Sequence, residues 1–345
     1  MSDKTDLLIL DSSDGGIAAA HAPPAAHSVF VGPATSDQFN TIRPDLRPVA
    51  CCSLYDNRFD FDSSFIRPEA AKEFGFLATL RKAHAGSPVS IFGHADPSGK
   101  EDYNKTLSGR RAEAVYALLT RDTGMWERLY SEPFGGDDWG LKSVQAMLDA
   151  LLFDPRRTDG VMDGRAREAV AAFQREQGLQ ADAKPGPQTR AKLFRAYMDV
   201  LCRDRGAQPY TLTKEDFLAR GADAKGKGDF QGCGEFNPLL LFSQKVEDAF
   251  ERSKNKIARD IANMPNRRVL MYLFRPGAKI EPARWPCPRT REGAAGCKKR
   301  FWSDAERRRR RLPDERREFA ETRDTFACRF YDRLAVNSPC EAKPK

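Results

Sequence analysis

The sequence predicts an α+β protein in which a sheet and helices pack as two layers, interrupted by a small three-helix domain. Three observations support this class. Residues 58–123 alternate strand-like and helix-like patterns, residues 143–193 show helical periodicity with turns of their own, and the two ends of the chain differ in composition from both. A chain of 345 residues is long enough to bury the core that such an arrangement needs.

The order of elements from residue 58 is strand, helix, strand, helix. RFDFD (58–62) alternates apolar and polar residues with period two, as a half-buried strand does. Pro68 starts EAAKEFGFLATLRKAH, whose apolar residues share one helical face. VSIFGHAD (89–96) predicts the second strand, and YNKTLSGRRAEAVYALLTRDTG (103–124) predicts the second helix.

The two ends of the chain are compositionally distinct. Residues 1–52, rich in Ala, Pro, Ser and Asp, predict an irregular arm. Residues 277–345 form a basic extension with 19 Lys/Arg against 11 Asp/Glu, which is the whole net charge of +8. Such an extension could lie on nucleic acid or an acidic surface, but its interleaved acids favour a solvated, salt-bridged helix. We therefore expect no nucleic-acid partner.

Eight cysteines are present, and their spacing does not predict a metal site. No CxxC occurs, so zinc-ribbon spacing is absent, and we expect neither a metal nor a cofactor. If the protein works outside the cytoplasm, we expect Cys287 to pair with Cys297 and Cys328 with Cys340, stapling a segment with few large apolar residues. The alternative is that all four are small, reduced, buried residues.

No segment predicts passage through or insertion into a membrane. No run of about 18 apolar residues is present. The start MSDKTDLLILDSSDGG lacks the features of a Sec signal peptide. We therefore expect a protein that is cytoplasmic before delivery and reaches the envelope or the outside by another route.

The segment around the second strand resembles a known family. GHADPSGKEDYNKTLSGRRAEAV, together with the preceding FDFDSSFIRPEA, is similar to the OmpA-like peptidoglycan-binding domain, whose usual motif is GH(T)DxxGxxxYNxxLSxxRAxxV. Ala95 stands where Thr is common. The residues that match are Gly93, His94, Asp96, Gly99, Tyr103, Asn104, Leu107, Ser108, Arg111, Ala112 and Val115.

The closing strands of that family are displaced along the chain. GCGEFNP (232–238) and NRRVLMYLF (266–274) resemble them but follow about a hundred residues late. The resemblance implies an OmpA-like βαβαβ-type domain in two parts, 53–135 and 226–276. We expect a chain truncated after residue 225 to unfold or aggregate, because its sheet would be incomplete.

The block between these parts has a signature of its own. Residues 143–193 are similar to the small helical peptidoglycan-binding domain often appended to cell-wall hydrolases, with VQxxL, AVxxFQxxxGL and GPxT, although Arg165-Ala166-Arg167 replaces the common FGxxT. We assign this domain to residues 140–200 and expect that it can be removed. Its predicted core is Val144, Leu148, Val170, Phe173, Leu179 and Leu193.

The resemblance implies a binding site for diaminopimelate in peptidoglycan stem peptides. The free end of this residue carries an ammonium and a carboxylate, so it needs one carboxylate and one guanidinium held by rigid elements. Asp96 leaves the end of a strand and Arg111 lies about two turns into the next helix, facing back toward it. In the family the corresponding Asp takes the ammonium and the corresponding Arg takes the carboxylate.

Supporting residues and alternatives complete the predicted site. The resemblance adds Asn104 and Arg267 as supporting contacts and Ser63 as a weaker one. Alternatively, Asp96 only caps its loop and Arg111 only bridges to Glu113 or Asp102. His94, Phe173 and Gln174 are expected to be structural rather than ligand-binding.

The motifs therefore predict a non-catalytic peptidoglycan-binding protein. The alternative is a hydrolase or secreted effector that uses these domains for wall targeting. The four histidines all lie at or before residue 94, and no HExxH motif occurs, which disfavours a hydrolase. We expect a role in anchoring or targeting an envelope or contractile-injection-type assembly, such as a type VI apparatus, with a protein partner there.

Overall fold

The computed structural model describes residues 48–96, 98–222, 228–235, 240–241, 244–253, 256–280 and 317–318. Its centre is a four-stranded sheet, confirming the α+β class. The strands are β1 (Pro48–Tyr55), β5 (Arg268–Phe274), β2 (Val89–His94) and β3 (Phe230–Gly232), in that spatial order. β5 is antiparallel to both β1 and β2, and β3 is parallel to β2.

The sheet joins segments that are far apart in the sequence. The predicted strands at 89–96 and 266–274 correspond to β2 and β5, and every residue of both is buried. The predicted strand at 232–238 only overlaps the last residue of β3. The pairing of β5 with β1 and β2 places Arg268 between Tyr55 and His94, so three chain segments converge at one edge of the sheet. The exact domain boundaries stay a prediction.

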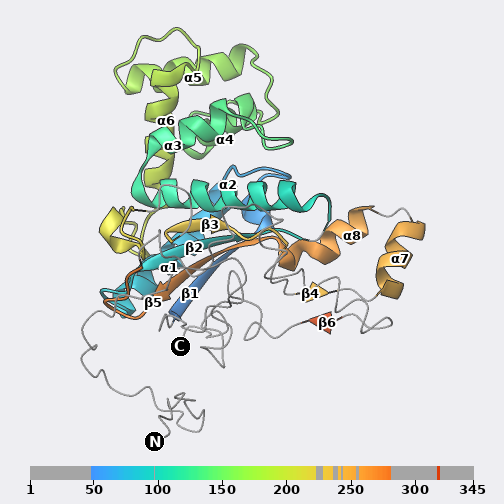
Figure 1. Ribbon diagram of the computed structural model, residues 1–345. Helices are drawn as coiled ribbons and strands as arrows, with labels where there is room; N and C mark the ends of the chain where they lie inside the picture. The colour runs from blue at the N-terminus through green and yellow to red at the C-terminus, as the bar shows by residue number, and fades with distance from the viewer. Residues whose placement is uncertain are drawn as a thin grey trace, which may run out of the picture.

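Two helices cover the sheet as predicted. α1 (Ala71–Ala83) follows a single 3₁₀ turn, η2 (Pro68–Ala70), and α2 (Glu101–Thr120) runs along the sheet, between it and the helical block that follows in the sequence (Figure 1). A Cβ atom at Gly93 would lie 1.9 Å from the carbonyl oxygen of Ser108, so glycine is required for α2 to approach β2 this closely. This contact fixes α2 relative to the end of β2.

The first strand is not where the sequence predicted it. The strand is β1, which crosses the predicted arm boundary at residue 52, whereas residues 58–67 form a tight loop after the 3₁₀ turn η1 (Asp56–Arg58). The alternation in RFDFD arises because Phe59 is buried and bridges Ile66, while Phe61 is 83% exposed. Asp62 has a φ of 51°, which no strand residue adopts. Period-two patterning therefore marked a loop.

The helical block has the three helices expected between residues 140 and 200. They are α4 (Gly140–Ala150), α5 (Gly164–Glu176) and α6 (Pro187–Leu201), preceded by α3 (Thr123–Ser131). Five of the six predicted core residues are buried, and Leu179 is half-buried. Asp163 caps α5 by accepting a hydrogen bond from the Ala166 amide at 2.8 Å.

This helical block shares a core with the layered domain. The ring of Trp126 packs edge-on against Trp139 at 5.2 Å and against Phe194 at 5.7 Å between ring centroids, and Phe65 stacks on Tyr197 at 6.0 Å. The Tyr197 hydroxyl donates to the carbonyl of Ile66 at 2.9 Å. Removing residues 140–200 would expose these faces to water, so we revise the expectation that removal is tolerated.

The last described elements lie at one end of the sheet. α7 (Gln244–Ser253) and α8 (Lys256–Asn263) precede the 3₁₀ turn η4 (Met264–Asn266), and β4 (Leu240–Leu241) pairs with β6 (Arg317–Glu318) (Figure 1). None of the helices in the described ranges is both long and apolar enough to cross a membrane.

The predicted disulfides fall outside the described residues, as does nearly all of the basic extension. Those four cysteines are Cys287, Cys297, Cys328 and Cys340. Of the described cysteines, Cys51 is disulfide-bonded, whereas Cys52, Cys202 and Cys233 are free and buried.

Candidate functional site

Asp96 lies where β2 ends, in a loop that turns sharply toward α2. Its residue is only 6% exposed. The carboxylate accepts a hydrogen bond from the Ser98 amide at 2.7 Å and forms an ion pair with Arg267 at 2.5 Å. Gly99 has a φ of 88°, a conformation that favours glycine, and it lets the chain turn from this loop into the helix. Asp96 is thus held as a buried hydrogen-bond acceptor.

Arg111 projects from α2 toward the same edge of the sheet. It is 3% exposed, and its guanidinium donates from Nε to the carbonyl of Ser63 at 2.8 Å. Nη1 lies 3.1 Å from a carboxylate oxygen of Asp56, and the guanidinium stacks 4.9 Å from the centroid of Phe59. Burial lowers the pKa of Arg111, and the carboxylate of Asp56 partly offsets this effect.

Arg267 comes to this edge from the residue before β5. Its Nε lies 2.8 Å from Asp56 and its Nη1 2.5 Å from Asp96, while Nη2 donates to the carbonyl of Asp260 at 2.8 Å. Burial acts to lower the pKa of Arg267, but the carboxylates of Asp56 and Asp96 outweigh it, so the pKa is raised. Arg267 therefore stays charged and joins both acids.

Asp56 is the member of this charged cluster that the sequence did not predict. Its two carboxylate oxygens bind different arginines, one on Arg111 and the other on Arg267. It begins η1, directly after Tyr55, which pairs with Arg268. Only the β1 register could have revealed that Asp56 faces Arg267, and the strand had been predicted elsewhere.

The four side chains form an alternating chain of charges. Its order is Arg111, Asp56, Arg267 and Asp96, and among the described residues no ion pair joins Asp96 to Arg111 directly. Together these four side chains carry two positive and two negative charges, so the cluster is formally neutral. Such an arrangement suits a ligand that is itself neutral overall but carries one charge of each sign.

The remaining predicted residues hold the charged side chains and their loop in place, and they are not themselves members of the series of ion pairs. Asn104 donates from Nδ2 to the carbonyls of Asp96 at 3.1 Å and Ser98 at 2.8 Å, so it holds the loop. Ser63 offers its carbonyl to Arg111, while its hydroxyl donates to Asp137 at 2.8 Å. His94 is buried at the end of β2, consistent with a structural role.

The helical block carries its charge cluster at the surface, where Arg157 pairs with Asp159 and Asp163. Gln174 is buried and donates to Asp182, Thr189 and the carbonyl of Lys184, and Phe173 is buried with it, so both contribute to the packing of the block. Arg165, in the substituted turn, forms only an exposed ion pair with Asp154 at 3.3 Å.

The described residues bear on metal binding through their possible ligands and on nucleophilic chemistry through two buried cysteines. Within these ranges, no group of three or more His, Cys, Asp and Glu side chains is placed to hold a metal ion. Burial raises the pKa of the Cys202 thiol to about 11 and also raises that of Cys52. Both therefore remain protonated near neutral pH and are unsuited to act as nucleophiles.

Comparison with known proteins identifies two families within the chain. The OmpA family model matches residues 58–136, and the model of a peptidoglycan binding domain matches residues 140–193.

The chain is also similar over part of its length to an outer membrane porin and to a peptidoglycan-associated lipoprotein. The chain is 32% identical over 80 residues to outer membrane porin F of Pseudomonas fluorescens, covering 23% of this chain and 24% of the porin. It is 29% identical over 113 residues to the peptidoglycan-associated lipoprotein of Legionella pneumophila, covering 31% of this chain and 60% of the lipoprotein. The chain thus spans about a quarter of the porin's length and about three fifths of the lipoprotein's.

Proposed function

Because the chain carries an OmpA-like domain together with a helical domain of the peptidoglycan-binding type, we propose that it is a non-catalytic peptidoglycan-binding protein. Its ligand is the zwitterionic end of diaminopimelate in the stem peptides. The observation that carries this proposal is the neutral, alternating chain of two arginines and two aspartates at one edge of the sheet.

Each charge of the ligand has a partner of opposite sign among these four side chains. The ligand's carboxylate binds Arg111, whose planar guanidinium can donate two parallel hydrogen bonds, and it competes there with Asp56. The ligand's ammonium binds Asp96, where it shares the carboxylate with Arg267. The exchange leaves every buried charge paired, which avoids the cost of an uncompensated ion.

The helical domain gives the protein a second contact with the same polymer. Two weak modules on one chain raise retention through effective concentration when both can engage the wall together. The shared core around Trp126 and Trp139 fixes one module against the other, so their spacing is constant.

A place in the cell envelope follows from binding to the wall. Proteins similar to part of this chain include some named as outer-membrane porins and peptidoglycan-associated lipoproteins. We place this protein in the envelope or among secreted proteins, where it anchors or targets an assembly of the contractile-injection type. Two wall-binding modules in one chain support that anchoring role.

A pull-down with purified sacculi tests the function. The full chain should sediment with sacculi whose stem peptides contain diaminopimelate, and free diaminopimelate should release part of it. Sacculi with lysine at that position, which lacks the second carboxylate, should retain less protein. Loss of sacculus turbidity would support the hydrolase alternative instead, and equal retention on both kinds of sacculi would contradict zwitterion recognition.

A further inference from the structure

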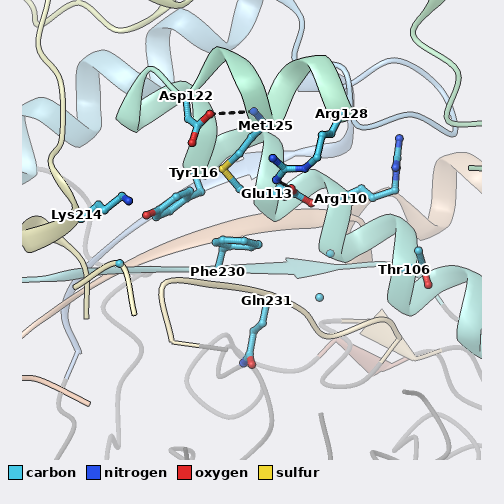
Figure 2. A pocket seen from close by; sticks show the side chains of 13 residues that line it. Thr106, Arg110, Glu113, Tyr116, Asp122, Met125, Arg128, Lys214, Phe230 and Gln231 are labelled. Atoms are coloured by element: carbon cyan, nitrogen blue, oxygen red, sulfur yellow. Dashed lines mark hydrogen bonds and ion pairs between the residues drawn. The ribbon is translucent and has the colours of Figure 1, made fainter. Parts of the chain in front are cut away.

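A cavity lies along α2, away from the four alternating charged side chains at the edge of the sheet. Its volume is about 480 Å³, and it opens between α2, the start of α3 and the edge strand β3 (Figure 2). Cavities of this size commonly hold small molecules. None of the residues in the alternating charge chain lines it.

The floor of the cavity is apolar and partly aromatic. It is formed by Tyr116, Met125 and Phe230, and the rings of Tyr116 and Phe230 lie 4.9 Å apart between centroids. Figure 2 shows Phe230 rising from β3 beneath Tyr116. Tyr116 also packs on Phe217 at 4.6 Å, so the floor is held from behind. Such a surface suits a ligand with an apolar face.

The rim carries fixed polar groups of both kinds. Glu113 accepts from Arg128 at 3.1 Å, and Arg110 is held by Asp137 at 2.5 Å and by the carbonyl of Leu129 at 2.9 Å. Thr106 adds a hydroxyl on the next turn of α2. The stem of Lys214 lies against Gly221, where a Cβ atom would be 2.6 Å from the lysine Cδ, so the ammonium is placed at the rim.

These charges favour a neutral polar ligand over a polyanion. Two of the three cations at the rim, Arg110 and Arg128, are already paired with carboxylates, and Asp122 caps α3 by accepting from the Met125 amide. A phosphate or nucleic-acid site would need several unpaired cations. An apolar ligand would cover the polar groups of the rim without replacing the hydrogen bonds that water gives them. A ring with an apolar face and hydroxyl or amide groups at its edges meets both demands.

The cavity is linked to the charged chain through one buried carboxylate. Asp137 is fully buried and accepts from the Ser63 hydroxyl at 2.8 Å on one side and from Arg110 on the other. Ser63 in turn offers its carbonyl to Arg111. Arg110 and Arg111 are neighbours on α2, so the two sites lie on adjacent faces of one helix.

We propose that this cavity binds an N-acetylated sugar of the glycan strand, with its apolar face on Phe230 and its hydroxyl and acetamide groups at the rim. This proposal rests on the proposed function, because stem peptides are attached to such sugars. A peptide held at Asp96 and Arg111 would then bring its own glycan strand toward the neighbouring face of α2.

The test is a pair of NMR titrations of the full chain, one with chitotriose and one with free diaminopimelate. Chitotriose should perturb the amides of residues around Phe230, and Arg128→Ala should weaken its binding by about tenfold through loss of a charge-assisted hydrogen bond. The matched control is Arg175→Ala, because Arg175 and Arg128 are both 56% exposed and both paired with a glutamate. It should leave chitotriose binding unchanged.

A second variant keeps the test independent of Arg128. Thr106→Trp places a bulky ring over the opening from an exposed helix position, and it should block chitotriose while leaving diaminopimelate binding intact. Asp96→Asn should do the reverse. Absence of chitotriose binding to the unaltered chain, or equal binding to Thr106→Trp, overturns the sugar site without touching the zwitterion site. If the unaltered chain binds chitotriose but not diaminopimelate, the second titration shows it, and that result contradicts the zwitterion site while leaving the sugar site standing.

Discussion

The carboxylate of Asp56 lies between two guanidinium groups and bonds to both. In this position it satisfies Arg111 and Arg267 in the same way that a ligand's carboxylate would satisfy Arg111. Asp56 therefore stabilises the free protein and competes with the ligand. Arg111 is the more dependent of the two on this contact, because its guanidinium is almost wholly buried.

We expect Asp56→Asn to lower stability and to strengthen the response to ligand. Removing a charge that is 17% exposed and paired with two arginines should cost roughly 1–3 kcal/mol of unfolding free energy. Diaminopimelate should then raise the melting temperature more in Asp56→Asn than in the unaltered chain, since its carboxylate restores the lost partner. An equal or smaller rise, measured by thermal denaturation, would show that Asp56 does not compete.

The motif predicted which residues would meet at this edge of the sheet, whereas the residue whose place depends on strand register was not predicted. Asp96, Arg111 and Arg267 were named from the sequence, and the structure brings all three to one edge of the sheet. The alternative in which Arg111 only bridges to Glu113 or Asp102 is not what the structure shows, because Arg111 bonds to Asp56. Asp56 precedes the motif and has no pattern of its own.

At the scale of elements, the closeness of α2 to β2 positions the site. Both Asp96, at the end of β2, and Arg111, on α2, depend on the contact between Gly93 and the Ser108 carbonyl. Helix α2 and strand β2 could be predicted because turn residues bound the short apolar run of β2 and the family motif continues from it into the helix. The strand β1 could not, because the stronger alternation lay in the loop 58–62 that follows it.

We expect Gly93→Ala to displace α2 and weaken the site. The added methyl group would lie 1.9 Å from a backbone oxygen, so the helix must shift, at a cost of about 1–3 kcal/mol or more. The matched control is Gly164→Ala at the first turn of α5, where nothing lies within 4 Å of the added atom. Thermal melting and diaminopimelate titration of both variants decide the point. Unchanged melting of Gly93→Ala would contradict the close-packing argument.

At the scale of the whole molecule, the OmpA-like part and the helical block pack together around one core. The sequence correctly indicates a helical block between residues 140 and 200, since its own apolar periodicity is complete. It does not reveal that Trp126, Phe65 and Tyr197 join that block to the layered domain, because contacts between elements leave no periodic trace. The shared packing was therefore the part of the fold that could not be predicted from the sequence.

We expect deletion of residues 140–200 to abolish cooperative folding. The deletion removes Phe194 and Tyr197, which cover Trp126 and Phe65, and it breaks the ion pair of Arg190 with Glu127. Large buried aromatic side chains each contribute several kcal/mol to the free energy of unfolding. Exposing several of them at once therefore costs more free energy than the whole stability of a typical domain. A soluble deletion variant with a sharp thermal transition would contradict the shared core and restore the interpretation of a removable module.

The central claim is that Asp96 and Arg111 recognise a zwitterion, and calorimetric titration of the full chain with meso-diaminopimelate tests it most directly. The unaltered chain should bind, and Asp96→Asn should lower the affinity roughly a hundredfold, because the ligand's ammonium loses its carboxylate partner. The control Asp199→Asn, which alters an ion pair with Arg121, should bind as the unaltered chain does. Binding by Asp96→Asn that equals that of the unaltered chain would contradict the account.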